Sequence, residues 1–509
     1  MSQSHSQAEM PLVDALRHCA DRLNAPFYTP GHKRGQSIAA PLKDLLGEKV
    51  FRADLPELPE LDNLFAPESV ILAAQELAAA AFGGDRTWFL ANGSTSGVIA
   101  AILATCNPGD SIILPRTVHQ SAISGLILSG AVPVFINPDY DAALDIAHSI
   151  TPEAVMAALS AHPNSKAVLM VSPTYYGACG NVSAIAQLAH NHGIPLIVDE
   201  AHGAHFAFHP DLPTSALQAG ADIAVQSTHK TLSALTQAAM VHVQGDLVDR
   251  DRLSKSLALV QSTSPSYLLL ASLDAARWQM ATQGEALMSH TLYLAEKARS
   301  RISQIPKLAT LSHHHATTPG FVDFDSTRLT VTVSGLGIDG FTADDILNTK
   351  LSVTAEFPSL QHLTFIISLG NTETDIEQLV SAFEKLSKQL SQTQNSKYFL
   401  RERHALAEPA RRTYKAQNLS SHSPLATCLS PLSPREAFFA ATETVAIATA
   451  INRISAELVC PYPPGIPVLI PGEVVTETAI ADLQQILASG GIISGCSDSS
   501  FATLKVVKA

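Results

Sequence analysis

One lysine lies among hydroxyl and imidazole side chains in the stretch QSTHKTLSALTQ, residues 226–237. Lys230 follows a serine, a threonine and His229, and the short apolar run ADIAV leads into the segment. The commonest place for a lysine is an exposed position at the end of an element, and that interpretation stays open. The chain continues, however, as the uncharged TLSALTQAAMV. An amine in partly dry surroundings has a lowered pKa and can form a Schiff base.

A second polar cluster lies in IVDEAHGAHF, residues 197–206, where Asp199 is followed by His202 and His205. A helicase DEAH box would require a phosphate-binding loop GxxxxGK[ST] upstream, and the dipeptide Gly-Lys occurs nowhere in the chain. A metal site made of these three residues lacks a convincing ligand spacing. The third interpretation is a carboxylate at a strand end that pairs with a protonated ring nitrogen.

A third segment, ANGSTSGV, residues 91–98, places small residues between an apolar run and an apolar helix. Free backbone N–H groups at a helix N-terminus suit a phosphate. The alternative is a tight turn with a serine as N-cap, which the motif by itself slightly favours.

Taken together, these parts match the needs of pyridoxal phosphate. The glycine-serine turn would hold the phosphate with help from Ser227 and His229, and Asp199 would pair with the pyridine nitrogen. Lys230 would bind the aldehyde. His119, in RTVHQS, is expected to stack on the ring face, although by itself it would be interpreted as a partly buried histidine. No metal is expected.

Length and composition place these motifs in an ordinary globular protein. The 509 residues suffice for two or three domains, and 46% of them are apolar against 16% charged. The formal net charge of −13 argues weakly against a nucleic-acid partner and mildly favours a cationic small substrate.

The compartment is expected to be reducing. The six cysteines are scattered and none forms a CxxC pair, which speaks against a disulfide framework or a zinc ribbon. The N-terminal segment has no apolar signal core, and no apolar run is long enough to span a bilayer. We expect a soluble cytoplasmic protein without a membrane partner.

Short apolar runs alternate with helical patterns between residues 87 and 244. The runs do not alternate in polarity, as expected for strands buried on both faces, and helix-length stretches such as SAIAQLAHNHG separate most of them. This pattern predicts a mostly parallel sheet covered by helices, with ligands at the carboxyl edge. Polar residues gather after five runs, at 92–96, 116–119, 172–175, 199–202 and 227–230.

The remaining chain is predicted to add smaller domains. Residues near 300–390 hold the runs RLTVTVSG, ILNTKLSVTAEF and HLTFIISLG, and a Ser-, Gln-, Asn- and Pro-rich stretch follows them. We predict an N-terminal arm (1–50), a large cofactor-binding domain (51–290), a small α/β domain (291–390), a linker (391–435) and a C-terminal domain (436–509).

These motifs resemble the Orn/Lys/Arg decarboxylase family across nearly the whole chain and in the family's order. The matching stretches are YTPGHKRG (28–35), NGSTSG (92–97), VDEAHGAHF (198–206), QSTHKTLSALTQ (226–237) and YPPGIPVLIPGE (462–473). The resemblance implies the aspartate-aminotransferase-like fold, called fold type I, with a seven-stranded mostly parallel sheet, a small α/β domain and a short C-terminal α+β domain. The chain is similar to the smaller members of the family, since we expect no room for an N-terminal wing domain before residue 28.

The resemblance implies a role for each motif residue. Lys230 is the Schiff-base lysine, Asp199 the partner of the pyridine nitrogen, His119 the stacking residue, and His202 the neighbour of the ring oxygen. The residues implied around the phosphate are Ser94, Thr95, Ser96, Ser227 and His229. The family often has lysine after the stacking histidine, whereas Gln120 stands here, which puts a peripheral contact in doubt.

The implied reaction is decarboxylation of L-lysine, L-ornithine or L-arginine to cadaverine, putrescine or agmatine, precursors in polyamine synthesis. Lys230 and His229 are the candidates that return a proton to Cα. The cationic end of the substrate needs an acidic partner, for which Glu356 and Glu457 are candidates, although both could equally be solvated carboxylates. The sequence does not distinguish the three substrates.

Two other functions remain open. An aminotransferase or lyase on the same fold often clamps the substrate carboxylate with an arginine of the small domain, but no arginine lies between Arg328 and Arg401. A non-catalytic paralogue would have lost the lysine or the aspartate, and both are present.

The resemblance also implies a homodimer or a dimer of dimers. In such an assembly YTPGHKRG and YPPGIP would reach the active site or the subunit interface, and plain structural turns are the alternative.

Overall fold

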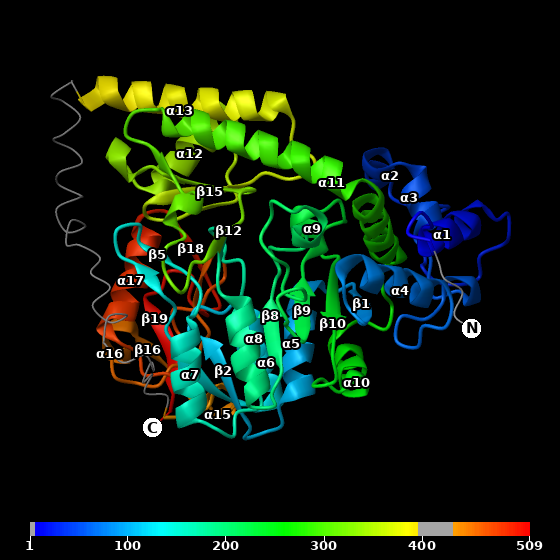
Figure 1. Ribbon diagram of the computed structural model, residues 1–509, viewed down its shortest axis with the longest axis horizontal. Coiled ribbons are helices and arrows are strands. Elements are labelled where there is room, and N and C mark those ends of the chain that lie inside the picture. The colour runs from blue at the N-terminus through cyan, green and yellow to red at the C-terminus, as the bar shows by residue number, and fades with distance from the viewer. Residues whose placement is uncertain (1–5, 395–430, 509) are drawn as a thin grey trace. The chain divides into compact units, whose positions relative to one another are not determined.

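The computed structural model of the chain describes residues 6–394 and 431–508 (Figure 1). Within this range the chain forms two compact units. The first combines residues 6–105 with 189–289, and the second combines 106–188 with 290–394 and 431–508.

The seven predicted apolar runs all form strands: β1 (Arg86–Leu90), β2 (Ser111–Pro115), β3 (Val132–Ile136), β6 (Ala167–Val171), β8 (Leu196–Asp199), β9 (Ile223–Gln226) and β10 (Ala239–Val243). They make one sheet in the order β1-β10-β9-β8-β6-β2-β3. β10 pairs antiparallel with β1 and β9, whereas β8–β9, β2–β6 and β2–β3 are parallel. The predicted seven-stranded, mostly parallel α/β fold class is confirmed.

The first unit holds an N-terminal helix that is anchored by buried charges. In α1 (Pro11–Asp21) the backbone N–H of Leu12 donates to Asp274 Oδ2 at 3.0 Å. Arg277, which is fully buried in α11 (Tyr267–Ser303), pairs with Asp274 and donates to the carbonyl of Gln7 at 2.8 Å. Residues 11–21 of the predicted arm are therefore packed into the first unit, while the arm's boundary at residue 50 stays a prediction.

Helix α5 (Gly93–Thr105) lies unusually close to the strands of the first unit because of Gly97. A Cβ at this position would come within 2.7 Å of Val225 Cγ1, 2.8 Å of Val241 Cγ2 and 2.9 Å of Leu90 Cδ1. Those distances are shorter than carbon–carbon contacts allow, so only glycine permits this approach. The approach sets the depth at which the first turn of α5, with its hydroxyl groups, meets β9.

The further helices of the first unit are short or cover its strands. They are α2 (Ala40–Leu46), α3 (Glu48–Ala53), α4 (Val70–Phe82), α9 (Thr228–Thr231) and α10 (Arg250–Val260). Helix α8 (Val182–Asn191), most of which belongs to the second unit, matches the predicted SAIAQLAHNHG helix, and Gly193 follows it with a φ of +70°.

The second unit contains a smaller antiparallel sheet in the order β11-β13-β15-β14. Its strands are β11 (Ala309–Thr310), β13 (Arg328–Thr332), β14 (Phe357–Pro358) and β15 (His362–Ile366). The helices α12 (Gly340–Leu351) and α13 (Glu373–Gln394) complete the small α/β fold. The run ILNTKLSVTAEF is not one strand as expected, because its first six residues finish α12 and only Phe357 reaches β14.

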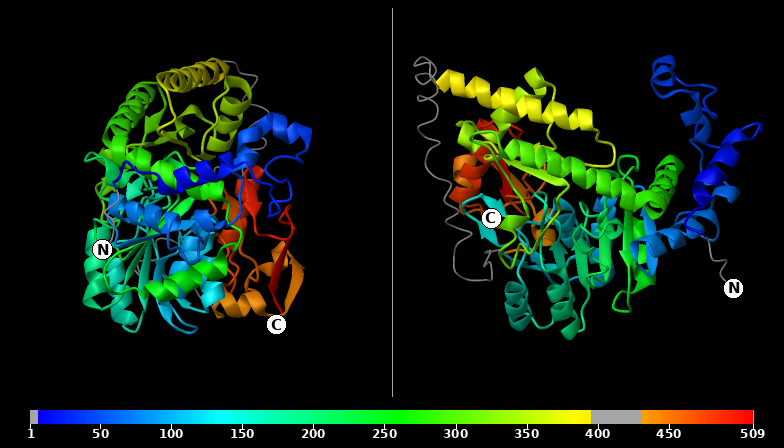
Figure 2. Two further views of the ribbon diagram at one scale, coloured as in Figure 1. Left: turned by 90° about the vertical axis from the view of Figure 1, so that its right-hand side faces the viewer. Right: turned by 45° about the horizontal axis from the view of Figure 1, so that its top comes forward.

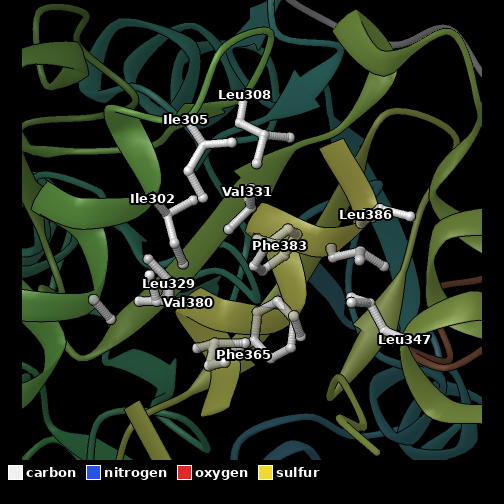
Figure 3. Close-up of a cluster of buried hydrophobic side chains, with 14 of the residues drawn as sticks. Ile302, Ile305, Leu308, Leu329, Val331, Leu347, Phe365, Val380, Phe383 and Leu386 are labelled. Atoms are coloured by element: carbon white, nitrogen blue, oxygen red, sulfur yellow. The ribbon is translucent and has the colours of Figure 1, made fainter. Parts of the chain in front are cut away.

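Apolar side chains from both helices and strands fill the core of this small domain (Figure 3). Ile302 comes from α11, Val331 from β13, Leu347 from α12 and Phe383 from α13, and each is buried. Figures 1 and 2 show α13 alongside the C-terminal part of α11. Glu377 of α13 pairs there with Arg301 at 2.6 Å.

The C-terminal segment is a small α+β domain, as the family resemblance implies. β16 (Thr442–Ala446) pairs with β19 (Thr503–Val507), and β17 (Cys460–Tyr462) with β18 (Ile492–Ser494), both antiparallel. Helices α15 (Pro434–Phe439) and α17 (Glu477–Ala488) accompany them.

Other helices of the second unit are α6 (Gln120–Ser129) and α7 (Pro152–Ala161). Most of the predicted linker at 391–435 lies outside the described residues, while its first residues continue α13 and its last two begin α15. The predicted domain boundaries stay predictions. Among the described residues, no helix is both long and apolar enough to cross a membrane.

The small-domain core gives a first prediction. Leu347→Ala removes a fully buried side chain and should lower the free energy of unfolding by roughly 2–5 kcal/mol, since the cavity cannot collapse completely. Leu259→Ala in α10, where the side chain is 79% exposed, is the matched control and should change it by less than about 0.5 kcal/mol. Chemical denaturation of both variants measures the difference, and equal losses would show that Leu347 is not a core residue.

Candidate active site

The carboxyl ends of β8 and β9 bring the predicted chemistry to one edge. The two strands are parallel neighbours, with Asp199 opposite Val225 in register. Asp199 is the last residue of β8, and Ser227 directly follows β9. Because parallel strands end at the same edge of a sheet, the acidic and the hydroxyl segments lie together within the first unit.

Lys230 lies in α9, one turn beyond the end of β9, and its Nζ is 3.1 Å from Nε2 of His202. The side chain of His202 is buried, as is that of Asp199. Burial raises the pKa of the Asp199 carboxyl, and the positive charge of Lys230 acts in the opposite direction. The predicted lysine, aspartate and histidine therefore form one electrostatically coupled group.

Hydroxyl groups from two distant segments meet at the start of α5. Ser227 Oγ donates to Ser94 Oγ at 2.6 Å. Thr95 is exposed on the same first turn, and the buried Ser96 donates its hydroxyl to the carbonyl of Gly93 at 2.8 Å. The hydroxyl proton of Ser96 thus stabilises the turn, while Ser94 and Ser227 form a pair at the N-terminus of a helix of 13 residues.

His229 is held by the loop that follows it. Its Nδ1 lies 2.8 Å from the carbonyl oxygen of Ala238, which can only accept, so Nδ1 carries a proton and in the neutral imidazole the lone pair is on Nε2. His205, the other histidine of the DEAH segment, is buried with its ring against Phe206. In the part of the chain that the structure describes, no cluster of three or more His, Cys, Asp or Glu side chains could hold a metal.

His119 belongs to the second unit, where it caps α6. Its Nδ1 accepts a hydrogen bond from the backbone N–H of Ser121 at 3.2 Å and lies 2.9 Å from the Ser121 hydroxyl. Its expected stacking role stays a prediction.

The two candidate carboxylates for the substrate's far end differ in their surroundings. Glu457 is buried and accepts from the backbone N–H groups of Ser497 at 2.8 Å and Lys505 at 2.9 Å, so it holds the C-terminal domain together. Glu356 lines a cavity of about 310 Å³ in the small domain together with Asp375. Only Glu356 therefore stays a candidate for contact with a cation.

A buried polar network behind the strand ends escaped the sequence analysis. Gln226 Nε2 donates to Glu200 Oε2 at 2.8 Å, and the side-chain Oε1 of Gln226 lies 3.0 Å from His242 Nε2. His242 Nδ1 in turn lies 2.8 Å from Thr87 Oγ1, and the backbone N–H of Ala216 donates to Glu200 Oε1 at 2.7 Å. The network links β8, β9, β10 and β1 directly beside Asp199 and Ser227.

Burial keeps the ionisable members of this network neutral. It raises the pKa of Glu200 to about 8 and lowers that of His242 to about 3. The signal that could have found this network is the glutamate of DEAH, Glu200, which directly follows an apolar strand and the candidate Asp199.

The fold and the site define a class before any relative is considered. An α/β sheet whose carboxyl edge carries a lysine, a buried carboxylate and hydroxyls at a helix N-terminus is typical of enzymes that bind a phosphorylated aldehyde cofactor.

Comparison with known proteins then identifies the family. The model of the Orn/Lys/Arg decarboxylase major domain matches residues 10–374, and that of the C-terminal domain of the same family matches residues 419–491. The chain belongs to the Orn/Lys/Arg decarboxylase family, which confirms the resemblance and makes the chain a carboxy-lyase acting on basic amino acids. The family depends on pyridoxal phosphate.

Two relatives illustrate the range of similarity. An arginine decarboxylase of Bacillus subtilis is 38% identical over 503 residues, covering 99% of this chain and 99% of that protein. A lysine decarboxylase of Pseudomonas aeruginosa is 25% identical over 556 aligned residues, covering 92% of this chain and 74% of that protein.

A solved structure shows the same fold. The lysine decarboxylase LdcF of Francisella novicida superposes with a TM-score of 0.83 at 23% identity, covering 98% of this chain and 81% of that one. The predicted fold type I architecture is thereby confirmed.

The neutral form of Glu200 gives a prediction about pH. Because the carboxyl binds its proton more tightly in the folded state (pKa about 8) than in the unfolded state (4.5), the contribution of Glu200 to stability is greatest below pH 4.5 and is lost as the pH rises to about 8. Glu200→Gln removes this titration.

Thermal melts of both proteins at several pH values test this expectation. The difference in melting temperature between wild type and Glu200→Gln should shift in favour of the variant as the pH rises from 5 to about 8. A difference that stays constant over this range would mean that Glu200 is ionised in the folded protein.

Proposed function

We propose that this chain is a pyridoxal-phosphate-dependent arginine decarboxylase that converts L-arginine to agmatine and CO₂. The observation that carries the cofactor assignment is the coupled group of Lys230, His202 and Asp199 at the ends of two parallel strands. Arginine is favoured because several arginine decarboxylases align over nearly the full length of the chain at 37–38% identity, whereas lysine decarboxylases align at 23–25%.

The residues of the first unit fit the cofactor. Lys230 offers an amine for its aldehyde, and buried Asp199 offers a carboxylate for its ring nitrogen. The Ser94–Ser227 hydroxyl pair at the N-terminus of α5 suits its phosphate. The buried Thr228 Oγ1, next to Ser227 in the chain, has no hydrogen-bond partner among the described residues, which suits a polar group of the cofactor as its partner.

The bound cofactor would supply an electron sink for the pair of electrons left when the Cα–carboxylate bond breaks. Asp199 would hold the proton on the ring nitrogen. Because Asp199 is buried, the attraction between its carboxylate and the protonated nitrogen would act in a low dielectric and would be stronger than in water. His202 would position the Lys230 amine. Lys230 and His229 are the proposed groups that return a proton to Cα, and His229 would do so from Nε2 in its protonated form, since its Nδ1 lies against the Ala238 carbonyl.

His119 is the proposed residue over the ring face, and Thr95, Ser96 and His229 complete the proposed phosphate surroundings. The guanidinium of arginine needs an acidic partner, and Glu356 is the proposed one, supported by its place in the acidic small-domain cavity. The substrate carboxylate, in contrast, must depart, and no arginine between Arg328 and Arg401 clamps it.

We further propose that the protein works in the cytoplasm as a homodimer or a dimer of dimers and that its product enters polyamine synthesis. The family resemblance supports the assembly, and the scattered cysteines support a reducing compartment. The competing activity on this fold is transamination, which would convert the substrate to a keto acid instead of an amine.

The substrate assignment predicts the products of a direct assay. Purified protein with added pyridoxal phosphate is incubated separately with L-arginine, L-ornithine and L-lysine, and mass spectrometry identifies the products. Agmatine from arginine should exceed cadaverine and putrescine, and Lys230→Ala should abolish both the amine and the visible absorbance of the bound cofactor. Lys255→Ala is the control lysine. Cadaverine or putrescine as the main product would reassign the substrate, and a keto acid would replace decarboxylation by transamination.

The role of Asp199 predicts a second result. Asp199→Asn keeps the size of the side chain but cannot stabilise the protonated ring nitrogen, so kcat should fall roughly 100-fold or more while the visible cofactor absorbance is retained. Asp222→Asn is a matched control, since Asp222 is equally buried and accepts from Leu196 N–H at 2.8 Å at the opposite end of the strands. This control should lower the melting temperature and leave kcat near wild type. Equal kcat losses in both variants would assign Asp199 a structural role.

A further inference from the structure

The YPPGIP segment of the C-terminal domain lies directly against His119 within the second unit. Gly465 accepts a hydrogen bond at its carbonyl from the backbone N–H of Gln120 at 3.1 Å. A Cβ at Gly465 would lie 3.2 Å from His119 Nε2 and 3.3 Å from its Cδ2. These distances are tighter than most side-chain contacts, so a Cβ at this position would require the imidazole or the loop to shift by a few tenths of an ångström.

The backbone of Gly465 also requires glycine for a second reason. Its φ of +86° lies in the left-handed region, which residues with a Cβ rarely adopt. The carbonyl of Pro461 accepts from the Gly465 N–H at 2.9 Å, which closes the turn. The backbone conformation at position 465 and the contact with His119 therefore both favour glycine.

Residues of the strand ends hold this loop in place. Arg116, three residues before His119, donates to the carbonyl of Pro467 at 2.8 Å and of Val468 at 3.1 Å. Its guanidinium also forms a bidentate pair with Glu473 at 2.9 and 2.8 Å, and both side chains are largely buried. The Tyr175 hydroxyl donates to the Pro464 carbonyl at 3.2 Å.

The ring of His119 is thus restrained from two directions. Ser121 N–H donates to Nδ1, so in the neutral imidazole the proton is on Nε2, the atom nearest to the loop. Rotation of the ring away from this arrangement would break the Ser121 contact or push the ring into Gly465. A side chain that must present one face to a planar cofactor gains affinity when its orientation is set in advance.

We infer that Gly465 and the YPPGIP loop are positioning elements of the reaction, through which the C-terminal domain orients His119 for the cofactor. This inference rests on the proposed function, in which His119 stacks on the ring of pyridoxal phosphate. Gly465 touches neither substrate nor cofactor in this proposal and acts through the histidine.

The test compares two glycine variants that share the backbone strain and differ in the contact. Gly465→Ala adds a Cβ against His119, and Gly490→Ala adds one at a φ of +89° with no atom within 4 Å. Both should lower the melting temperature similarly. Only Gly465→Ala should weaken the affinity of the apoprotein for pyridoxal phosphate, by roughly three- to tenfold if stacking is lost, and change the visible circular dichroism of the bound cofactor.

Hydrogen exchange of the cofactor-free proteins supplies an independent readout. Gly465→Ala should speed exchange in peptides that contain Gln120, and Gly490→Ala should not. Tyr175→Phe, which keeps the ring and removes the hydrogen bond to Pro464, should produce smaller changes in the same direction and serves if Gly465→Ala does not fold.

The outcomes separate the inference from the proposed function. Faster exchange near Gln120 together with weaker cofactor binding supports the inference. Cofactor affinity and dichroism that match those of Gly490→Ala overturn it, whether or not exchange changes. If wild-type protein shows no affinity for pyridoxal phosphate, the proposed function itself fails, and the exchange data then show only a structural contact.

Discussion

The burial of one carboxylate, that of Asp199, is the constraint on which the arrangement of the polar groups in the first unit depends. A carboxylate taken out of water costs several kcal/mol unless a cation or hydrogen bonds compensate it. Lys230 provides the cation, and its amine is held by the buried imidazole of His202. Parallel pairing of β8 with β9 brings the two charges to one edge, because both segments leave the sheet at their carboxyl ends.

The neighbouring polar groups are arranged so that no second charge competes with this pair. Glu200, adjacent to Asp199 in the chain, is kept neutral by burial and is bonded to Gln226 and to the backbone of Ala216. His242 is neutral for the same reason. A hydrogen-bonded neutral network fixes the strand ends without adding a charge beside the Asp199–Lys230 pair.

In the second unit, an ion pair and backbone hydrogen bonds hold the loop that contacts His119. Its C-terminal loop is held by the buried Arg116–Glu473 pair and by backbone hydrogen bonds, and a glycine allows that loop to contact His119. Bidentate pairing of a planar guanidinium fixes both distance and orientation. A carboxyl-terminal domain that is remote in sequence can in this way restrain a histidine of the sheet edge.

The sequence by itself determined the seven strands, the family and the chemical character of the strand ends. Unbroken Val, Ile and Leu runs that alternate with helical patterns favour a covered, mostly parallel sheet, and the residues that follow its parallel strands share an edge. For the same reason Lys230 and Asp199 could be singled out from their local surroundings.

Only the tertiary structure decided which groups touch. The Ser94–Ser227 bond spans 133 residues and depends on the depth to which Gly97 lets α5 approach the strands. Glu457 looked like a substrate ligand in sequence but is occupied by backbone N–H groups 40 and 48 residues away. Local patterns encode burial and periodicity, whereas the partner of a buried polar group depends on packing between distant segments, which no short stretch of sequence contains.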